Sequence, residues 1–372
     1  MKKHTGFFIK ALLFIAVIYV WPSCNKNGND PATPSGSDST KTDTTKNTND
    51  TIVYKGWVVT TLAGSGTYGY ADGVGTAAKF SNPSSITIDA YDNIYLAESI
   101  THSIRKITPS GVVSTLVKED SSAGYVFGKI DEIITDKQGN FFLPNYENRT
   151  YYIRKLTTNL STIFAGNTLQ GFKDGLGTDA RFNITYSIAI DPNNNMYVPD
   201  YDGQGKFAIR KITPAGLVTT LSLTDNTGIS NGYKDRYHAI TADTQGNLYF
   251  ADGTNISVIK KIDPQGNVTV VAGTDAKGFK DGKGQQAQFG VVISLQVDKT
   301  GNIWLCDPEN YAIRRISPDG TVTTIAGGTS GYKNGNAAEA RFKTPYELAI
   351  SSDGAVYIID YGTNVIRKLK YY

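Results

Sequence analysis

Seven side chains with the potential for chemistry stand directly before short apolar strands that recur along the chain. Carboxylates can bind calcium or act as general acids and bases, and tyrosines can hold a sugar by stacking and hydrogen bonding. The same groups could instead hydrogen-bond one another or water in a polar channel. For any one of these residues we favour the channel-lining role, and for the group as a whole we predict that it belongs to a ligand-binding surface. The seven are Asp131, Glu132, Tyr186, Tyr237, His238, Tyr346 and Glu347.

The segments that must position these residues belong to a repeat with six copies. A complete copy has an apolar run ending in Asp, a Gly-Asn-type turn, an aromatic strand, an Ile-Arg-Lys strand, a Pro-x-Gly turn and a Val-Thr-Thr-Leu strand; the sixth copy has Ser351 in place of the Asp. Copies recur every 47 to 55 residues, and the residues within them alternate between apolar and polar, which is typical of β-strands. A repeat of four short strands predicts an all-β fold, a six-bladed β-propeller with four-stranded blades.

The ends of the repeat region predict how the ring closes. The sixth copy stops after Ile366–Leu369 and lacks the Val-Thr-Thr-Leu strand. A matching segment, Trp57–Gly64, stands before the first copy. We expect this N-terminal strand to pair with the last blade, because the pairing removes an exposed strand edge.

The repeated motifs resemble those of the NHL-repeat family of six-bladed propellers over residues 54–372. The likeness rests on D-x-x-G-N-(I/L)-Y-(V/F)-A-D, I-R-K-I and G-x-V-T-T-(L/I)-A-G. A further element, G-(Y/F)-x-(D/N)-G-x-G-x-x-A-x-F, resembles a bacterial subgroup, and we read its copies as ordered surface turns. The resemblance implies a fold but no single activity, since relatives include binding modules, lyases and lactonases. The element occurs at Gly69–Phe80, Gly171–Phe182 and Gly278–Phe289, and at Gly331–Phe342 with Ala337 in place of its second Gly.

The N-terminus predicts export. Three lysines precede the apolar run Ala11–Val20, and Ser23 and Cys24 follow it, so residues 1–23 resemble a bacterial lipoprotein signal peptide. We expect lipidation of Cys24, secretion across the inner membrane, and anchoring in the cell envelope, facing the periplasm or the exterior. Ordinary signal cleavage or an uncleaved anchor are the alternatives. Residues 24–53 are polar and predict a flexible tether.

Charge and rare residues narrow the function classes. Without the three signal-segment lysines the chain has 34 basic and 34 acidic residues, so nothing predicts a nucleic-acid partner. Outside the signal segment the only histidines are His102 and His238, too few for a histidine-based lyase centre. Cys306 stands where sister copies have Ala, and we expect it to fill the core.

Two further repeated positions are predicted to be structural. The aromatic position of each copy should pack between blades. The acidic or amide position that follows should pair with a basic residue of the next strand. The aromatic residues are Tyr95, Phe142, Tyr197, Tyr249, Trp304 and Tyr357; the expected pairs are Glu98–Arg105, Asn145–Arg154, Asp200–Arg210, Asp252–Lys260, Asp307–Arg314 and Asp360–Arg367.

Strand direction places the candidate residues on one face of the ring. The loops between second and third strands, the blade connections and the starts of the inner strands share the face that we call the upper face. Binding residues concentrate on such loops, and we expect the Gly-rich connections to make this face uneven. We therefore predict a non-catalytic binding module for a protein or glycan, with no cofactor. The alternative is a calcium-dependent lactonase, resembling gluconolactonase-type propellers, with Asp131, Glu132 and Glu347 near the metal.

Overall fold

The propeller lies in one compact unit, Val53–Tyr372, of a computed structural model. The signal segment, Cys24, Tyr237 and His238 lie outside the described residues. Among the described residues no helix is long and apolar enough to cross a membrane. The structure describes residues 55–120, 130–147, 150–157, 160–202, 204, 206–224, 239–252 and 257–372.

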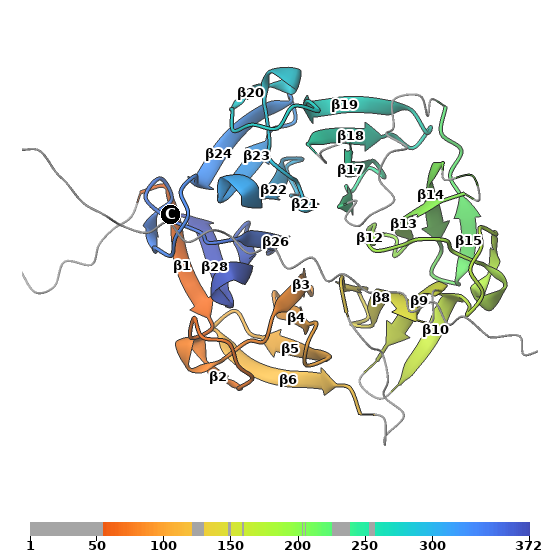
Figure 1. The fold of residues 1–372 in the computed structure, drawn as a ribbon, viewed down its shortest axis with the longest axis horizontal. Coiled ribbons are helices and arrows are strands. Elements are labelled where there is room, and N and C mark those ends of the chain that lie inside the picture. Colours follow the sequence, from red (N-terminus) through yellow and green to blue (C-terminus); the bar gives the residue numbers. More distant parts are fainter. Residues whose placement is uncertain are drawn as a thin grey trace, which may run out of the picture. The chain divides into compact units, whose positions relative to one another are not determined.

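Six antiparallel sheets of four or five strands form the blades of a ring (Figure 1), which confirms the predicted six-bladed propeller. Within each blade the chain runs from the inner strand outward. Blade 1 has β3 (Pro83–Ile88), β4 (Ile94–Glu98), β5 (Ser103–Ile107) and β6 (Val112–Lys118). Blade 2 has β7 (Ile134–Thr135), β8 (Phe141–Glu147), β9 (Thr150–Leu156) and β10 (Ser161–Gly166). Blade 3 has β12 (Ala189–Ile190), β13 (Met196–Tyr201), β14 (Phe207–Ile212) and β15 (Leu217–Thr220).

The second half of the ring repeats this order. Blade 4 has β16 (Ile240–Ala242), β17 (Leu248–Asp252), β18 (Val258–Ile262) and β19 (Val268–Gly273). Blade 5 has β21 (Ser294–Val297), β22 (Ile303–Asp307), β23 (Ala312–Ile316) and β24 (Thr321–Gly327). Blade 6 has β26 (Pro345–Ile350), β27 (Val356–Asp360) and β28 (Val365–Tyr371). Short 3₁₀ turns η4 (Pro308–Asn310) and η5 (Tyr361–Thr363) follow the second strands of blades 5 and 6.

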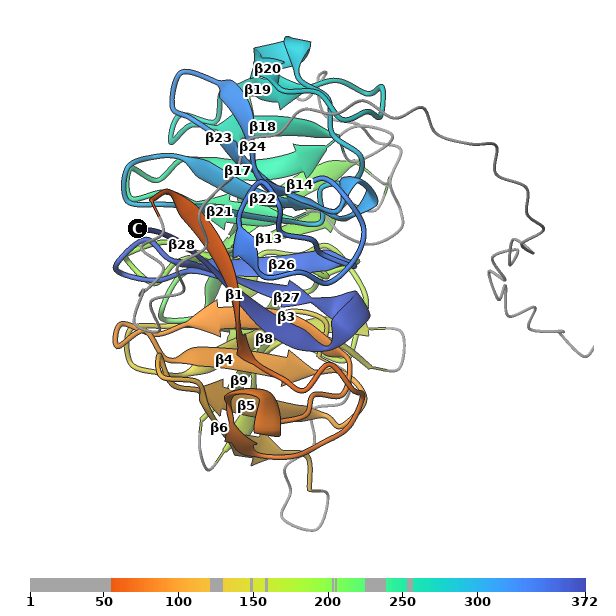
Figure 2. The ribbon, with the colours of Figure 1, turned by 90° about the vertical axis from the view of Figure 1, so that its left-hand side faces the viewer.

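The N-terminal strand closes the ring as predicted. Strand β1 (Trp57–Ala63) pairs antiparallel with β28, from Trp57 opposite Tyr371 to Ala63 opposite Ile366. Figure 2 shows β1 from the side, beside the last blade. The edge that blade 6 would otherwise expose is therefore covered by a strand from the other end of the domain.

The Gly-rich segments differ from the prediction. Each forms a two-residue strand against the outermost strand of a blade, rather than a loop that makes the upper face uneven. Its final Phe is buried, as Phe80 and Phe289 show. Two-residue strands have no periodicity to read in a sequence, and here they cover outer edges. The short strands are β2 (Gly73–Val74), β11 (Gly175–Leu176), β20 (Gly282–Lys283) and β25 (Gly335–Asn336), in blades 1, 3, 5 and 6. In blades 1, 3 and 5 a 3₁₀ turn follows: η1 (Gly75–Ala77), η2 (Gly177–Asp179) and η3 (Gly284–Gln286).

All six predicted polar pairs are present. In blade 5 the guanidinium of Arg314 is fully buried and donates to Asp307 at 3.1 Å and to Asp281 of the Gly-rich segment at 2.8 Å. It also donates to the carbonyl oxygens of Gln288 and Lys280. The pair thus joins the second and third strands to the segment that covers the blade edge. The other pairs are Glu98–Arg105, Asn145–Arg154, Asp200–Arg210, Asp252–Lys260 and Asp360–Arg367.

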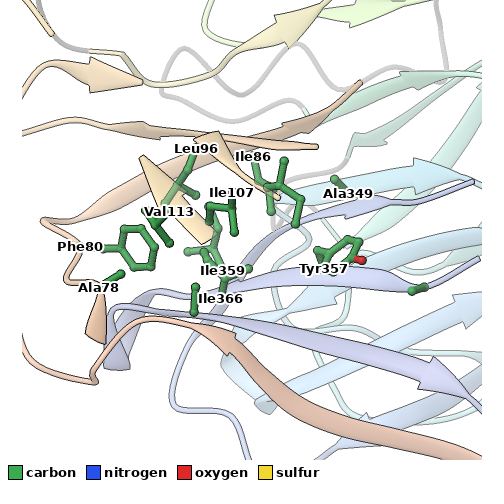
Figure 3. Packing of buried hydrophobic residues seen from close by; sticks show 13 residues of the cluster. Ala78, Phe80, Ile86, Leu96, Ile107, Val113, Ala349, Tyr357, Ile359 and Ile366 are labelled. Atoms are coloured by element: carbon green, nitrogen blue, oxygen red, sulfur yellow. The ribbon is translucent and has the colours of Figure 1, made fainter. Parts of the chain in front are cut away.

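Aliphatic and aromatic side chains fill the spaces between blades. Between blades 6 and 1, Tyr357 and Ile359 pack against Ile86 and Leu96 (Figure 3). All six repeated aromatic residues belong to such clusters, which confirms their packing role. Cys306 is also buried, as expected. The inner strands are thereby held in place around the channel.

Candidate functional site

One position near the start of the inner strands forms a ring around the upper end of the channel. It lies four residues before the residue that ends each apolar run. In four of the six blades its side chain reaches the backbone of the following blade: the N–H of Ile133 donates to Ser85 Oγ at 3.0 Å, and that of Ile188 donates to Glu132 Oε2 at 3.1 Å. The six residues are Ser85, Glu132, Ser187, Ala239, Ser294 and Glu347.

The same hydrogen bond, from a backbone N–H to this side chain, joins two other pairs of neighbouring blades. The N–H of Leu348 donates to Ser294 Oγ at 3.3 Å, and the N–H of Ile86 donates to Glu347. Ser85 also donates to Glu347 Oε1 at 3.1 Å. These side chains therefore tie neighbouring inner strands together. This structural role was missed from the sequence, although Ser and Glu recur at one position of the repeat.

Five of the seven predicted residues line one cavity at this level. They are Asp131 and Glu132 before β7, Tyr186 before β12, and Tyr346 and Glu347 within β26. The cavity has a volume of about 40 Å³, which is room for a few water molecules. Tyr237 and His238 lie outside the described residues.

The two glutamates in this cavity favour their protonated forms. Burial raises the pKa of Glu132 to about 8, and the neighbouring charge of Asp131 acts in the same direction. Burial raises the pKa of Glu347 well above its usual range, and the charge of Glu132 adds to the effect. Two like charges this close disfavour joint ionisation, so the pair retains a proton more readily than separate carboxyls.

Tyrosines form two groups on the upper face. Between blades 2 and 3 the hydroxyls of Tyr151 and Tyr186 are 2.5 Å apart, and the Tyr146 ring lies 4.8 Å from that of Tyr151. On blade 6 the rings of Tyr346 and Tyr361 are 5.4 Å apart. Tyr146 is 55% exposed and Tyr361 is 36% exposed. The sequence reasoning missed Tyr146, Tyr151 and Tyr361. The only signal for Tyr146 and Tyr361 was a Tyr directly after the polar-pair position of the second strand.

The channel widens below the glutamates. A cavity of about 190 Å³ is lined by residues of all six inner strands, among them Ile88, Ile190 and Gln296. A third cavity of about 330 Å³ opens at the lower end, beside Lys137 and Lys299. Both lysines donate to carbonyl oxygens of the next blade. No motif of the sequence predicted a site at this end.

The described residues offer no convergent set for a metal ion. No group of three or more His, Cys, Asp or Glu among them has the geometry to hold one. Asp131, Glu132 and Glu347 line the same cavity without forming such a group. The calcium site of the alternative prediction would therefore need backbone or amide oxygens besides these three carboxylates.

Comparison with known proteins agrees with the fold and motifs. A family model, the teneurin NHL domain, matches residues 174–333. These residues therefore match an NHL domain, within a ring of six blades. One curated relative, Protein SUPPRESSOR OF QUENCHING 1, chloroplastic, of Arabidopsis thaliana, is 30% identical over 89 residues. That match covers 23% of this chain and only 8% of the relative's length.

Two solved structures show the same fold. An auxiliary nutrient binding protein from Bacteroides thetaiotaomicron superposes with a TM-score of 0.65 at 22% identity, over 87% of this chain and 78% of that one. A gluconolactonase from Xanthomonas campestris, XC5397, superposes with a TM-score of 0.53 at 10% identity, over 86% of this chain and 96% of that one. At these identities the likeness concerns the fold alone.

Proposed function

We propose that this six-bladed propeller is a non-catalytic binding module that takes a protein or glycan ligand on its upper face. The exposed rings of Tyr146 and Tyr361 carry the proposal, because each packs beside a buried or half-buried tyrosine on that face. Tyrosine offers a large rigid contact area and a hydroxyl at low entropic cost, which suits both ligand classes.

The inner carboxylates support binding without chemistry. Glu132 and Glu347 each accept a hydrogen bond from the backbone of the next blade. The cavity beside them, about 40 Å³, is too small for a sugar ring or a lactone. A large ligand must therefore lie on the loops above it. The fold shared with an auxiliary nutrient binding protein agrees with a binding role.

A ligand screen with a matched control tests the proposal. The purified protein is applied to glycan and peptide arrays, and each hit is titrated against Tyr146→Ala/Tyr361→Ala and against Tyr91→Ala. Tyr91 is 83% exposed in the turn between β3 and β4, on the opposite face. We expect at least a tenfold loss of affinity in the double variant and none in the control. Equal affinity in all three proteins would place the binding surface elsewhere.

Lactone hydrolysis is the second candidate. Glu132, with a pKa of about 8 next to a second carboxyl, has the character of a general acid or base. The test is hydrolysis of glucono-δ-lactone by the wild-type protein and by Glu132→Gln, with calcium and with a chelator. We expect no hydrolysis above the uncatalysed rate. Hydrolysis by the wild-type protein that is lost in Glu132→Gln would show that the protein is an enzyme and not a binding module.

We also propose that the protein is exported and held at the cell envelope through lipidated Cys24. The positive and apolar segments before Cys24 and the polar segment after it support this. A tethered propeller can then present its upper face to ligands outside the inner membrane. Mass spectrometry of the mature N-terminus tests the proposal, and an unmodified Cys24 would contradict it.

A further inference from the structure

We propose that the cavity between Glu132 and Glu347 binds a primary ammonium group, from a free amine or from a lysine side chain of a partner. The inference rests on the proposed binding role and names the chemistry of one part of the ligand. Three features of the cavity support it: the hydrogen-bond acceptors in the lining, the charge of the lining and the volume of the cavity.

The first observation is a buried hydroxyl. Ser187 lines the cavity and is only 4% exposed. It lies near enough to the Glu132 carboxyl for its interaction with that group to lower the Glu132 pKa. A hydroxyl that donates to Glu132 still has lone pairs, so it can accept an N–H bond from a ligand in the cavity. Beside it, the carboxyl groups can accept further N–H bonds.

The second observation is the sign of the charge. The cavity lining contains Asp131, Glu132 and Glu347 and, within the described residues, no Lys, Arg or His. An anion would be repelled, and a neutral hydroxyl would leave the glutamate pair protonated. A cation beside the pair favours its ionised form and pairs with the carboxylates.

The third observation is size, together with the aromatic residues at the same cavity. An ammonium group is about as large as a water molecule, and about 40 Å³ holds only a few waters. Tyr186 and Tyr346 also line the cavity, where their rings can attract the cation and pack along its methylene stem.

Binding must be coupled to proton release. Below about pH 8 the glutamate pair holds a proton. When an ammonium enters, a carboxyl O–H bond breaks, the proton leaves to solvent, and the new carboxylate accepts N–H bonds from the ligand. An alkylammonium stays charged up to about pH 10, so affinity should rise between pH 6 and pH 8. Asp131, Glu132, Glu347, Tyr186 and Tyr346 are the titratable groups of the described lining.

The test is calorimetric titration of the full chain with n-butylamine and with n-butanol, at pH 6 and pH 8, in two buffers of different ionisation enthalpy. A second arm compares acetyl-Gly-Lys-Gly-amide with the norleucine peptide. We expect both amines to bind, at least fivefold more tightly at pH 8, with proton release, while butanol and the norleucine peptide do not. Binding of the lysine peptide alone would assign the ammonium to a partner protein, and binding of butylamine alone to a small amine.

Variants make the result specific. The double variant Glu132→Gln/Glu347→Gln should abolish amine binding, and Ser187→Ala should weaken it several-fold. The control is Glu339→Gln, which replaces an exposed carboxylate that pairs with Lys333, and it should leave amine binding unchanged. Melting temperatures verify that each variant is folded. Equal binding of butanol and butylamine, or amine binding that survives the double substitution, would overturn the inference. If no amine binds while an array ligand still depends on Tyr146 and Tyr361, only the ammonium inference fails; if neither binds, the proposed function fails too.

Discussion

Replacing Glu132 by glutamine should make the propeller more stable at high pH. The folded-state pKa of Glu132, about 8, is above its ordinary value of 4.5. A carboxyl with a raised folded-state pKa contributes stability below its unfolded pKa, and this contribution is lost as pH rises through the folded value. Glutamine has the shape of the protonated side chain and does not titrate. The variant should therefore keep its stability where the wild-type protein loses it.

The structure sets the size of the effect. A shift from 4.5 to about 8, at about 1.4 kcal/mol per pH unit, gives a ceiling of about 5 kcal/mol. The carboxylate borders a cavity large enough for water and keeps the hydrogen bond from Ile188, so its ionisation costs less than this ceiling. We expect a loss of about 2 kcal/mol between pH 5 and pH 9. For a domain of roughly 300 residues this corresponds to about 3 °C in melting temperature.

Scanning calorimetry at five pH values from 5 to 9 measures the effect. Wild-type protein and Glu132→Gln should melt together at pH 5, and the variant should melt about 3 °C higher at pH 9. Glu339→Gln is the control, because its ion pair with Lys333 lowers the Glu339 pKa and keeps its titration below this range. Parallel curves for wild type and Glu132→Gln would refute the raised pKa and, with it, the protonated glutamate pair.

Four further outcomes are expected. Deleting residues 54–64 removes β1, so the domain should aggregate or lose much of its thermal stability; an unchanged melting curve would contradict the ring closure. Arg314→Ala leaves Asp307 buried without its cation and should cost about 3–5 kcal/mol in chemical denaturation, whereas Arg315→Ala on the same strand should cost far less. Cys24→Ala should abolish lipid attachment, measured by mass spectrometry, and leave the melting temperature unchanged. Calcium and chelator should both leave the melting temperature unchanged; a rise with calcium that Glu132→Gln removes would restore the metal-enzyme alternative.

The repeat made the fold readable from the sequence. Six copies of one strand pattern predicted six blades, and the strand missing after Leu369 predicted the closure through Trp57–Gly64. The buried pair of Arg314 with Asp307 was predictable because both residues recur at fixed positions. The fifth strands of the Gly-rich segments were not predictable, because their two residues pair only through tertiary contact.

The candidate site was predictable only in part. Asp131, Glu132 and Glu347 line one cavity, because residues at the starts of inner strands must surround the channel. The hydrogen bonds that join Glu132 and Glu347 to the backbone of the next blade depend on the spacing between blades, which cannot be predicted from a single repeat. Tyr146 and Tyr361 were missed because their significance comes from neighbours on other strands or blades.

Hydrogen–deuterium exchange of the full chain, with and without a ligand from the array screen, tests the upper-face proposal most directly. We expect slower exchange in residues 145–147, 185–188 and 345–348, and no change in the Pro-x-Gly turns of the opposite face. Protection confined to those turns, or to the cavity beside Lys137 and Lys299, would contradict the account.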